Sequence, residues 1–347
     1  MTQQIDIKSL YPEELAEQLG AEGYPKFRAK QVCDWLNKGV VEFSQMNNIP
    51  RDLREFLNTR YYISVATIEK KFVSRYDKTV KYLFSLNDGE MVEAVVMHYH
   101  HGVSMCISTQ VGCKMGCTFC ATGKSGFSRD LTASEMLTQI EAAQKDLSLR
   151  IANIVLMGMG EPLDNFENVV RFIKLVSSDG GLQIGMRHIT LSTCGIVPKI
   201  YELAEQKLSI NLAVSLHAPN DAIRSRTMPV AKAYPMDMLL KACRDYFDST
   251  GRRVTFEYAL ISGVNDSDSH ARELAQKLSG MNCHVNLIPV NAVEGTAYKK
   301  SDLQRQQSFV HILTAKGIAA TIRRTLGSDI NASCGQLKRN HIKEGGQ

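Results

Sequence analysis

The distribution of hydrophobic and polar residues changes twice along the chain. In residues 1–60 apolar side chains recur at the spacing of amphipathic helices, as at Leu15 and Leu19. From about residue 62 to 108 the apolar residues fall into short runs between Asp, Asn and Gly turns: YYISVATI, KTVKYLFSL, MVEAVVMHY and VSMCIST. The first part is therefore predicted to be helical and the second β-rich, with a boundary within residues 60–100.

Further along, short apolar strands alternate with amphipathic helices. Helical spacing is found in LTASEMLTQIEAAQKDL, SDSHARELAQKLSG and SDLQRQQSFVHILTAKG. Six strands are predicted by the segments IANIVLMGM, RHITLST, SINLAVSL, RRVTFEYALI, CHVNLIPV and IAATIRR. Repeated βα units form parallel sheets covered by helices, and in barrels of this kind the chemistry gathers at the carboxyl ends of the strands. The predicted fold class is α/β, with a partial (βα)6 TIM-like barrel.

These patterns divide the chain into four predicted parts. Residues 1–60 form a small helical N-terminal accessory domain, and residues 61–98 form a β-rich connector. Residues 99–337 form the barrel and a C-terminal loop. The remaining ten residues, KRNHIKEGGQ at 338–347, are a polar tail that we expect to fray.

Composition narrows the class of protein. The chain has 347 residues, of which 44% are hydrophobic and 22% charged, as in a globular protein with a sizeable core. The start, MTQQIDIKSL, lacks the pattern of a signal peptide, and no apolar run is long enough to span a membrane. We therefore expect a soluble cytoplasmic protein, in which nine cysteines point to metal or redox chemistry. The net charge of +5 permits an RNA partner without requiring one.

The strongest chemical signal is a cysteine loop. Cys113, Cys117 and Cys120 form the pattern C-x3-C-x2-C in VGCKMGCTFCATG. Ordinary [4Fe–4S] clusters and closed zinc sites take four protein ligands, so three thiolates leave one iron open to a bound substrate. The alternatives are buried structural thiols or a zinc knuckle. In the knuckle, the fourth ligand would be His98, His100, His101 or Cys106.

The spacing of this loop, with Phe119 before the last cysteine, resembles the radical-SAM superfamily. Six motifs, of which the cysteine loop is the first, narrow the resemblance to the RlmN/Cfr family of radical-SAM RNA methyltransferases, from the N-terminal helices to about residue 337. In chain order, these motifs are VGCKMGCTFCATG, MGMGEPLDN, LSTCGIVP, SLHAPND, NLIPVN and DINASCGQL. The resemblance implies one [4Fe–4S] cluster held by the three cysteines, with S-adenosylmethionine on the open iron.

The resemblance also implies a route for methylating an adenine carbon that is too electron-poor for direct attack on a sulfonium. Cys334 is first methylated by displacement, for which a thiolate is a good nucleophile. A second S-adenosylmethionine then supplies a radical that removes hydrogen from this methyl group, and the resulting methylene radical adds to the base. Glu93 matches the proton acceptor, and Cys106 matches the resolving cysteine that forms a transient disulfide with Cys334. By themselves, these residues would be read as a solvated strand glutamate and two buried thiols.

For S-adenosylmethionine, the resemblance implies contacts at several strand ends. The glycine-rich turn after a strand contributes Gly160 and Glu161, although such a turn alone is a weak signal. The other implied contacts are Ser192, Ser215, Leu216, His217 and Asn291. Four remaining cysteines match no functional position of the family and are predicted to be packing residues: Cys33, Cys194, Cys243 and Cys283.

The implied substrates are 23S rRNA, in its peptidyl-transferase region, and the tRNA adenosine 3′ to the anticodon. In residues 222–253 there are seven Lys or Arg against three Asp, which can neutralise phosphates around an unstacked base. The helical N-terminal domain resembles the accessory RNA-binding domain of the family. We also expect an external one-electron donor such as flavodoxin or ferredoxin, no membrane partner, and a monomer.

Methylation at C2 or at C8 distinguishes the two branches of the family. The stretches FEYALISGVND, NLIPVNAVEGT and IRRTLGSD resemble the RlmN branch, which modifies C2, more than the Cfr branch, which modifies C8. Three residues depart from the family pattern: Ala292 stands in place of a proline, Asn331 of an aspartate and Ser333 of an alanine. Two other hypotheses are a zinc-bearing, non-enzymatic RNA-binding protein and a radical-SAM enzyme acting on a protein or small molecule.

Overall fold

The computed structural model describes residues 4–291, 293 and 295–337, and it begins with a small helical unit. Its elements are β1 (Ile5–Asp6), η1 (Ile7–Ser9), α1 (Pro12–Ala21), α2 (Phe27–Asn37), η2 (Phe43–Gln45), α3 (Arg51–Arg60) and β2 (Tyr61–Tyr62). Pro12 stands in the first turn of α1, where its missing N–H costs nothing. Buried side chains between Ile7 and Ile63, including Leu15 and Leu19, form a core separate from that of the sheet.

The rest of the chain is built on one sheet of ten strands, in the order β14-β13-β12-β11-β10-β9-β6-β5-β4-β3. One side is antiparallel: β3 (Thr67–Val73), β4 (Val80–Ser85), β5 (Met91–Tyr99) and β6 (Gly102–Cys106). From β6 onward the pairing is parallel, through β9 (Asn153–Leu156), β10 (Ile189–Thr193), β11 (Asn211–Ser215), β12 (Val254–Leu260), β13 (Cys283–Pro289) and β14 (Ala319–Ile322). All six strands predicted after the cysteine loop are present, and the α/β fold class is confirmed.

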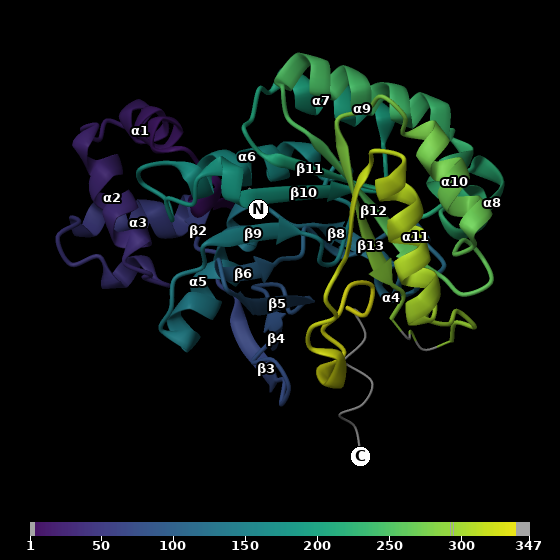
Figure 1. The fold of residues 1–347 in the computed structure, drawn as a ribbon. Coiled ribbons are helices and arrows are strands. Elements are labelled where there is room, and N and C mark those ends of the chain that lie inside the picture. The colour runs from purple at the N-terminus through teal and green to yellow at the C-terminus, as the bar shows by residue number, and fades with distance from the viewer. Residues whose placement is uncertain (1–3, 292, 294, 338–347) are drawn as a thin grey trace.

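Helices cover the parallel strands from outside. Figure 1 shows α7, α9, α10 and α11 in an arc around the strands, with α1–α3 set apart at one side. The helices of this part are α5 (Ala133–Leu147), α6 (Phe166–Ser177), α7 (Val197–Glu205), α8 (Asp221–Thr227), α9 (Met236–Thr250), α10 (Asp268–Lys277) and α11 (Leu303–Ala315). Short elements complete it: β7 (Gln110–Gly112), α4 (Ala121–Lys124), β8 (Phe127–Asp130), η3 (Met186–His188), η4 (Pro229–Lys232) and η5 (Ser328–Ile330).

The first strand predicted from the sequence does not form as a single strand. The segment YYISVATI contributes β2 and only the start of β3, because Tyr61 and Ile63 pack into the N-terminal core. The strand at the sheet edge is instead centred on Lys70 and Lys71, whose charges discourage pairing with another chain. Within the part of the chain that the structure describes, no helix is long and apolar enough to cross a bilayer.

Candidate active site

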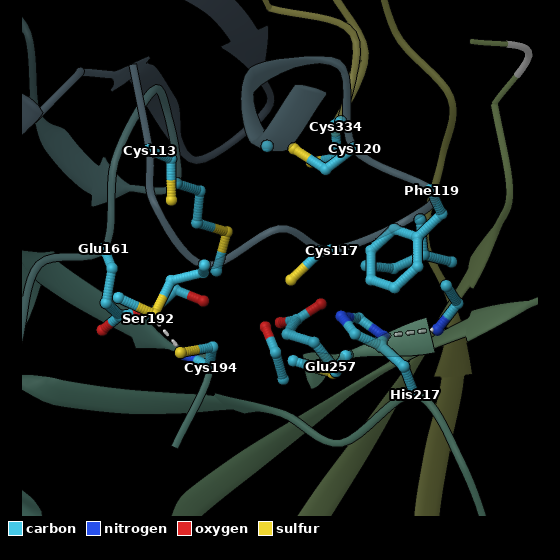
Figure 2. Close-up of a pocket in the computed structure, with 18 of the residues that line it drawn as sticks. Cys113, Cys117, Phe119, Cys120, Glu161, Ser192, Cys194, His217, Glu257 and Cys334 are labelled. Atoms are coloured by element: carbon cyan, nitrogen blue, oxygen red, sulfur yellow. Dashed lines mark hydrogen bonds between the residues drawn. The ribbon is translucent and has the colours of Figure 1, made fainter. Parts of the chain in front are cut away.

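A cavity lies at the carboxyl ends of the parallel strands, the place where barrels of this kind carry their chemistry. The ends of four strands line it through Gly160, Ser192, Ser215 and Asn291. The cysteine loop closes it from the other side. Figure 2 shows the side chains of Cys113, Cys117 and Cys120 around the open centre of this cavity.

The cysteine loop is shaped by close backbone contacts. The backbone N–H of Cys113 donates to the carbonyl of Gly126 at 2.8 Å, and the N–H of Cys120 donates to that of Cys117 at 3.2 Å. Gly112 adopts φ +82°, and a Cβ there would lie 1.9 Å from the Gly126 oxygen. No residue other than glycine fits this position. The close approach of β7 and β8 therefore fixes the position of the first cysteine, Cys113.

The chemistry of these thiols fits an iron–sulfur cluster. Burial raises the pKa of Cys113 to about 12 and also raises the pKa of Cys117. Thiolates are therefore costly here unless positive charge from a metal compensates them. Three soft donors in one loop beside a cavity lined by polar strand ends suit a cluster with one iron left for a small ligand.

Glu161 follows β9 in a turn that only small residues can make. A Cβ on Gly158 would lie 2.5 Å from the Ile107 carbonyl oxygen. Glu161 is buried, and its two oxygens accept from the backbone N–H groups of Leu163 at 3.0 Å and Cys194 at 2.7 Å. Burial raises the pKa of Glu161 while these hydrogen bonds oppose the change. The carboxylate is thus held in a fixed orientation at the cavity wall, suited to a ligand cation.

His217 lies at the end of β11 with φ +54°, a left-handed conformation that is uncommon outside glycine. Its Nδ1 accepts from the Ala259 backbone N–H at 2.8 Å, which leaves the ring hydrogen on Nε2. Burial, with a smaller contribution from the Arg224 charge, lowers the pKa of His217 to about 3. The ring meets Phe119 edge-on, with 4.8 Å between centroids, so a neutral imidazole offers one donor at the cavity wall (Figure 2).

Of the seven residues expected to contact S-adenosylmethionine, all except Leu216 line this cavity. Leu216 lies in the core, where its backbone N–H donates to the Glu257 carbonyl at 3.0 Å. The cavity residues that the sequence did not single out include Cys194, which was expected to be a packing residue, together with Glu257 and Arg323. Glu257 could have been found, because it is the one charged residue in the apolar run VTFEYALI.

Cys334 occupies a special position, since it borders two cavities. It lines the cavity of the cysteine loop and also a smaller neighbouring cavity lined by Cys106 and Val95. The Cys334 carbonyl accepts from the Asn291 side chain at 3.1 Å, and the Gly335 carbonyl accepts from the backbone of Ala121 at 2.8 Å. These bonds hold the C-terminal loop against the cysteine loop, from which it is distant in sequence.

The predicted resolving cysteine and base lie on the antiparallel side of the sheet. Burial and, to a smaller extent, the nearby Cys334 thiol raise the pKa of Cys106 to about 12, although the Arg323 charge opposes both effects. Cys106 pairs with Val95 across β5 and β6, and Glu93 lies two residues from Val95 on the same face of β5. Glu93 is completely buried, so its interpretation as a solvated strand residue is wrong.

The departures from the family pattern fit locally. Asn331 has φ +49°, which asparagine tolerates better than most residues. The Ser333 hydroxyl donates to the Leu326 carbonyl at 2.8 Å, so the added oxygen is satisfied. Ala292 lies outside the described residues.

The histidines proposed as fourth zinc ligands gather at the turn between β5 and β6. The ring of His101 stacks on Tyr99, with 5.1 Å between centroids, and His100 meets His101 edge-on at 4.9 Å. The cysteines instead line the cavity at the strand ends. This geometry favours the cluster over the zinc knuckle.

Comparison with known families agrees with this site. The Radical SAM superfamily model matches residues 107–275, which contain the cysteine loop and the strands β9–β12. A second model, the ribosomal RNA large subunit methyltransferase N-terminal domain, matches residues 5–63. The fold and the cavity therefore define a radical-SAM protein, which uses S-adenosylmethionine and a [4Fe–4S] cluster.

Individual relatives specify the family. A protein of Alkaliphilus oremlandii named "probable dual-specificity RNA methyltransferase RlmN" is 54% identical, covering 98% of this chain and 99% of its own length. A Clostridium tetani protein of the same name is 52% identical over 99% of this chain and 98% of its own. A radical SAM methyltransferase structure from Sphaerobacter thermophilus matches with a TM-score of 0.91 and 44% identity, covering 96% of this chain and 99% of that one. The chain belongs to the RlmN family of radical-SAM RNA methyltransferases.

Proposed function

We propose that this enzyme methylates C2 of an adenosine in 23S rRNA and of the adenosine 3′ to the anticodon in tRNA, through an S-methylcysteine at Cys334. One observation carries the proposal. Cys334 borders both the cavity of the cysteine loop and the cavity of Cys106, so one sulfur can face first a methyl donor and then a second thiol. The names of the relatives support RNA as the substrate class.

The residues lining the first cavity divide into cluster ligands and residues that bind S-adenosylmethionine. Cys113, Cys117 and Cys120 would hold the cluster, which with S-adenosylmethionine supplies one-electron cleavage to a 5′-deoxyadenosyl radical. Glu161, next to Gly160, would accept from the ligand ammonium, whose charge offsets the cost of burying this carboxylate. The remaining contacts would be Ser192, Ser215, the Leu216 backbone, His217 and Asn291.

Three protein groups would then act in turn on the methyl group and the base. The Cys334 thiolate takes a methyl group by displacement. After that carbon is joined to the adenine, a Glu93 carboxylate oxygen accepts the proton from C2. One electron would also leave the base and return to the cluster. The Cys106 thiolate then attacks the Cys334 sulfur and breaks its bond to the carbon; the carbon takes up a proton and leaves with the base as a methyl group, while the two cysteines form a disulfide. The Arg323 guanidinium, which lines both cavities, lowers the cost of charge on Cys106.

The choice of C2 rather than C8 follows from the chain's likeness to RlmN proteins. The test is mass spectrometry of nucleosides from RNA that was incubated with enzyme, S-adenosylmethionine and reductant. We expect 2-methyladenosine. If 8-methyladenosine is found instead, the Cfr-type alternative is correct, and the absence of either product would overturn the proposed substrate.

Several finer features complete the proposal. Each turnover uses two molecules of S-adenosylmethionine, one as methyl donor and one as radical source, and electrons come from a donor such as flavodoxin or ferredoxin. The helical part before residue 61 binds RNA, and basic residues of the barrel neutralise phosphates. We expect a monomer that acts in the cytoplasm, where its RNA substrates occur.

The first prediction concerns the methyl carrier. Replacement Cys334→Ala removes the sulfur that accepts the methyl group, so methyl transfer to RNA is abolished while the cluster ligands remain. The measurement combines methylation of tRNA with iron content and the visible absorption of the cluster. Cys33→Ala, which removes a half-buried thiol of α2 far from the cavity, is the control and retains activity. Methylation by the Cys334→Ala protein would refute the S-methylcysteine route.

A further inference from the structure

A buried ion pair joins two antiparallel strands beside the second cavity. The ammonium nitrogen of Lys81 on β4 lies 3.2 Å from Oε1 of Glu93 on β5. The Lys81 side chain is 7% exposed and that of Glu93 is 0% exposed. Lysine is almost never buried to this degree without a partner, and removing one member of such a pair leaves an uncompensated charge. The Lys81–Glu93 ion pair is therefore an integral part of the structure of this region of the sheet.

The strand register places this pair on the face that carries Cys106. Lys81 is paired with Val95, and Glu93 is paired with Leu83, so the two charged residues are diagonal neighbours on one face. Val95 in turn pairs with Cys106, and both line the cavity that Cys334 borders. Glu93 and Cys106 therefore lie on the same face of the sheet, and Cys334 borders the cavity that Cys106 lines.

Lys81 also reaches the loop that carries Cys334. Its ammonium nitrogen is 3.4 Å from the carbonyl oxygen of Asn331, three residues before Cys334, and 5.1 Å from the centre of the Phe72 ring. The same loop is fixed to the β3–β4 turn by two further bonds. The Gly327 N–H donates to Asp77 at 2.9 Å, and the Arg75 N–H donates to Asp329 at 2.9 Å.

We propose that Lys81 is a positioning residue that aligns the Glu93 carboxylate with the Cys334 loop for removal of the C2 proton. This inference rests on the proposed function, in which Glu93 is the proton acceptor. A lysine ammonium has three donors, so it can bind the carboxylate and the Asn331 carbonyl at once. The bond from Lys81 to the Asn331 carbonyl is separate from its bond to Glu93, so it holds the Cys334 loop in place while Glu93 accepts the proton.

Replacement of Lys81 by methionine separates this role from simple stability. Methylation of Cys334 needs no base on the RNA, so Lys81→Met should still form S-methylcysteine, as mass spectrometry of the Cys334 peptide would show. Transfer of that methyl group to RNA in a single turnover should be about 100-fold slower, as misplacement of a catalytic group by about 1 Å predicts. The KM for RNA should change by no more than about twofold. Lys81→Arg, which keeps the charge and donors, should recover part of the rate.

A double-mutant cycle tests whether Lys81 acts through Glu93. If it does, Lys81→Met combined with Glu93→Gln is no slower than Glu93→Gln alone. Lys71→Met is the matched control, because Lys71 lies on the neighbouring strand and pairs with Asp146 of α5. This control should methylate RNA at the wild-type rate. If Lys81→Met does not fold, Lys81→Gln, which can still donate to Asn331, takes its place in the cycle.

Several results would overturn the inference. One is a wild-type transfer rate in Lys81→Met, and another is additive losses in the cycle. A third is a parallel fall in Cys334 methylation, melting temperature and RNA transfer, which would reduce Lys81 to a structural residue. Failure of the proposed function gives a different result, because then the wild-type enzyme itself makes no 2-methyladenosine.

Discussion

At the scale of single residues, His217 combines features that general sequence rules disfavour. It has a left-handed backbone, a buried ring and a neutral imidazole whose Nδ1 accepts from the Ala259 backbone. Backbone strain of this kind is usually kept where a function needs the geometry. Here it directs a neutral donor into the cavity while burial keeps the ring from taking a proton.

The second prediction follows from the pKa of His217. Burial lowers this pKa to about 3, whereas in the unfolded chain it is about 6.5. The contribution to stability is therefore complete above about pH 6.5 and is lost as the pH falls from there toward 3. Between pH 7.5 and 5.5 the wild type should lose about 1.4 kcal/mol more unfolding free energy than His217→Gln, measured in urea. Identical pH dependence in the two proteins would contradict the neutral, buried state.

At the scale of elements, the hairpin of β7 and β8 frames the cysteine loop. The two strands flank the loop and α4, and the β7 end is pressed against the turn at Gly126. This contact fixes the position of Cys113. The geometry of the cluster site therefore depends on the close contact between two backbone segments rather than on side-chain packing.

The third prediction compares two glycines of this hairpin. Gly112 and Gly126 both have positive φ, but a Cβ at Gly112 would meet the Gly126 oxygen, whereas a Cβ at Gly126 has open space within 4 Å. Gly126→Ala should cost only the strain of the left-handed backbone, about 1 kcal/mol of unfolding free energy. Gly112→Ala should cost about 3 kcal/mol and lower the iron bound per chain after reconstitution. Equal losses in the two variants would show that the close approach is unimportant.

At the scale of the whole molecule, polar contacts help to fasten the N-terminal unit to the barrel. Asp6 is buried and accepts from the hydroxyls of Ser64 at 2.7 Å, Thr132 at 2.7 Å and Ser134 at 2.8 Å. Thr132 and Ser134 stand at the start of α5, where a carboxylate also interacts favourably with the helix dipole. An ion pair between Arg171 of α6 and Glu14 of α1 adds a second link.

The fourth prediction tests this junction. Asp6→Ala leaves the buried hydroxyls of Ser64 and Ser134 and the partly buried hydroxyl of Thr132 without this acceptor, which should cost about 2–3 kcal/mol. We expect a lower thermal midpoint and faster proteolytic cleavage between the N-terminal unit and the sheet. Asp34→Ala, at an exposed position of α2, should behave like the wild type. The docking role of Asp6 is wrong if the two variants are cleaved at the same rate.

Much of this architecture was predictable because it depends on local periodicity. Six βα strands, the N-terminal helices and the C-x3-C-x2-C loop are each contained in a short stretch of sequence, and each was found there. The misplaced strand in YYISVATI shows the limit of local pattern, because Tyr61 and Ile63 belong to a core that the apolar run alone does not identify.

The sequence by itself determined the chemical class, since three cysteines at this spacing and the strand-end motifs carry the family's signature. Only the tertiary structure decided that Glu93 is buried, that Lys81 pairs with it, and that Cys334 borders both cavities. The physical reason is distance along the chain. Contacts such as Lys81 with Asn331 arise from strand pairing and loop docking, and such non-local contacts leave no periodic trace in the sequence.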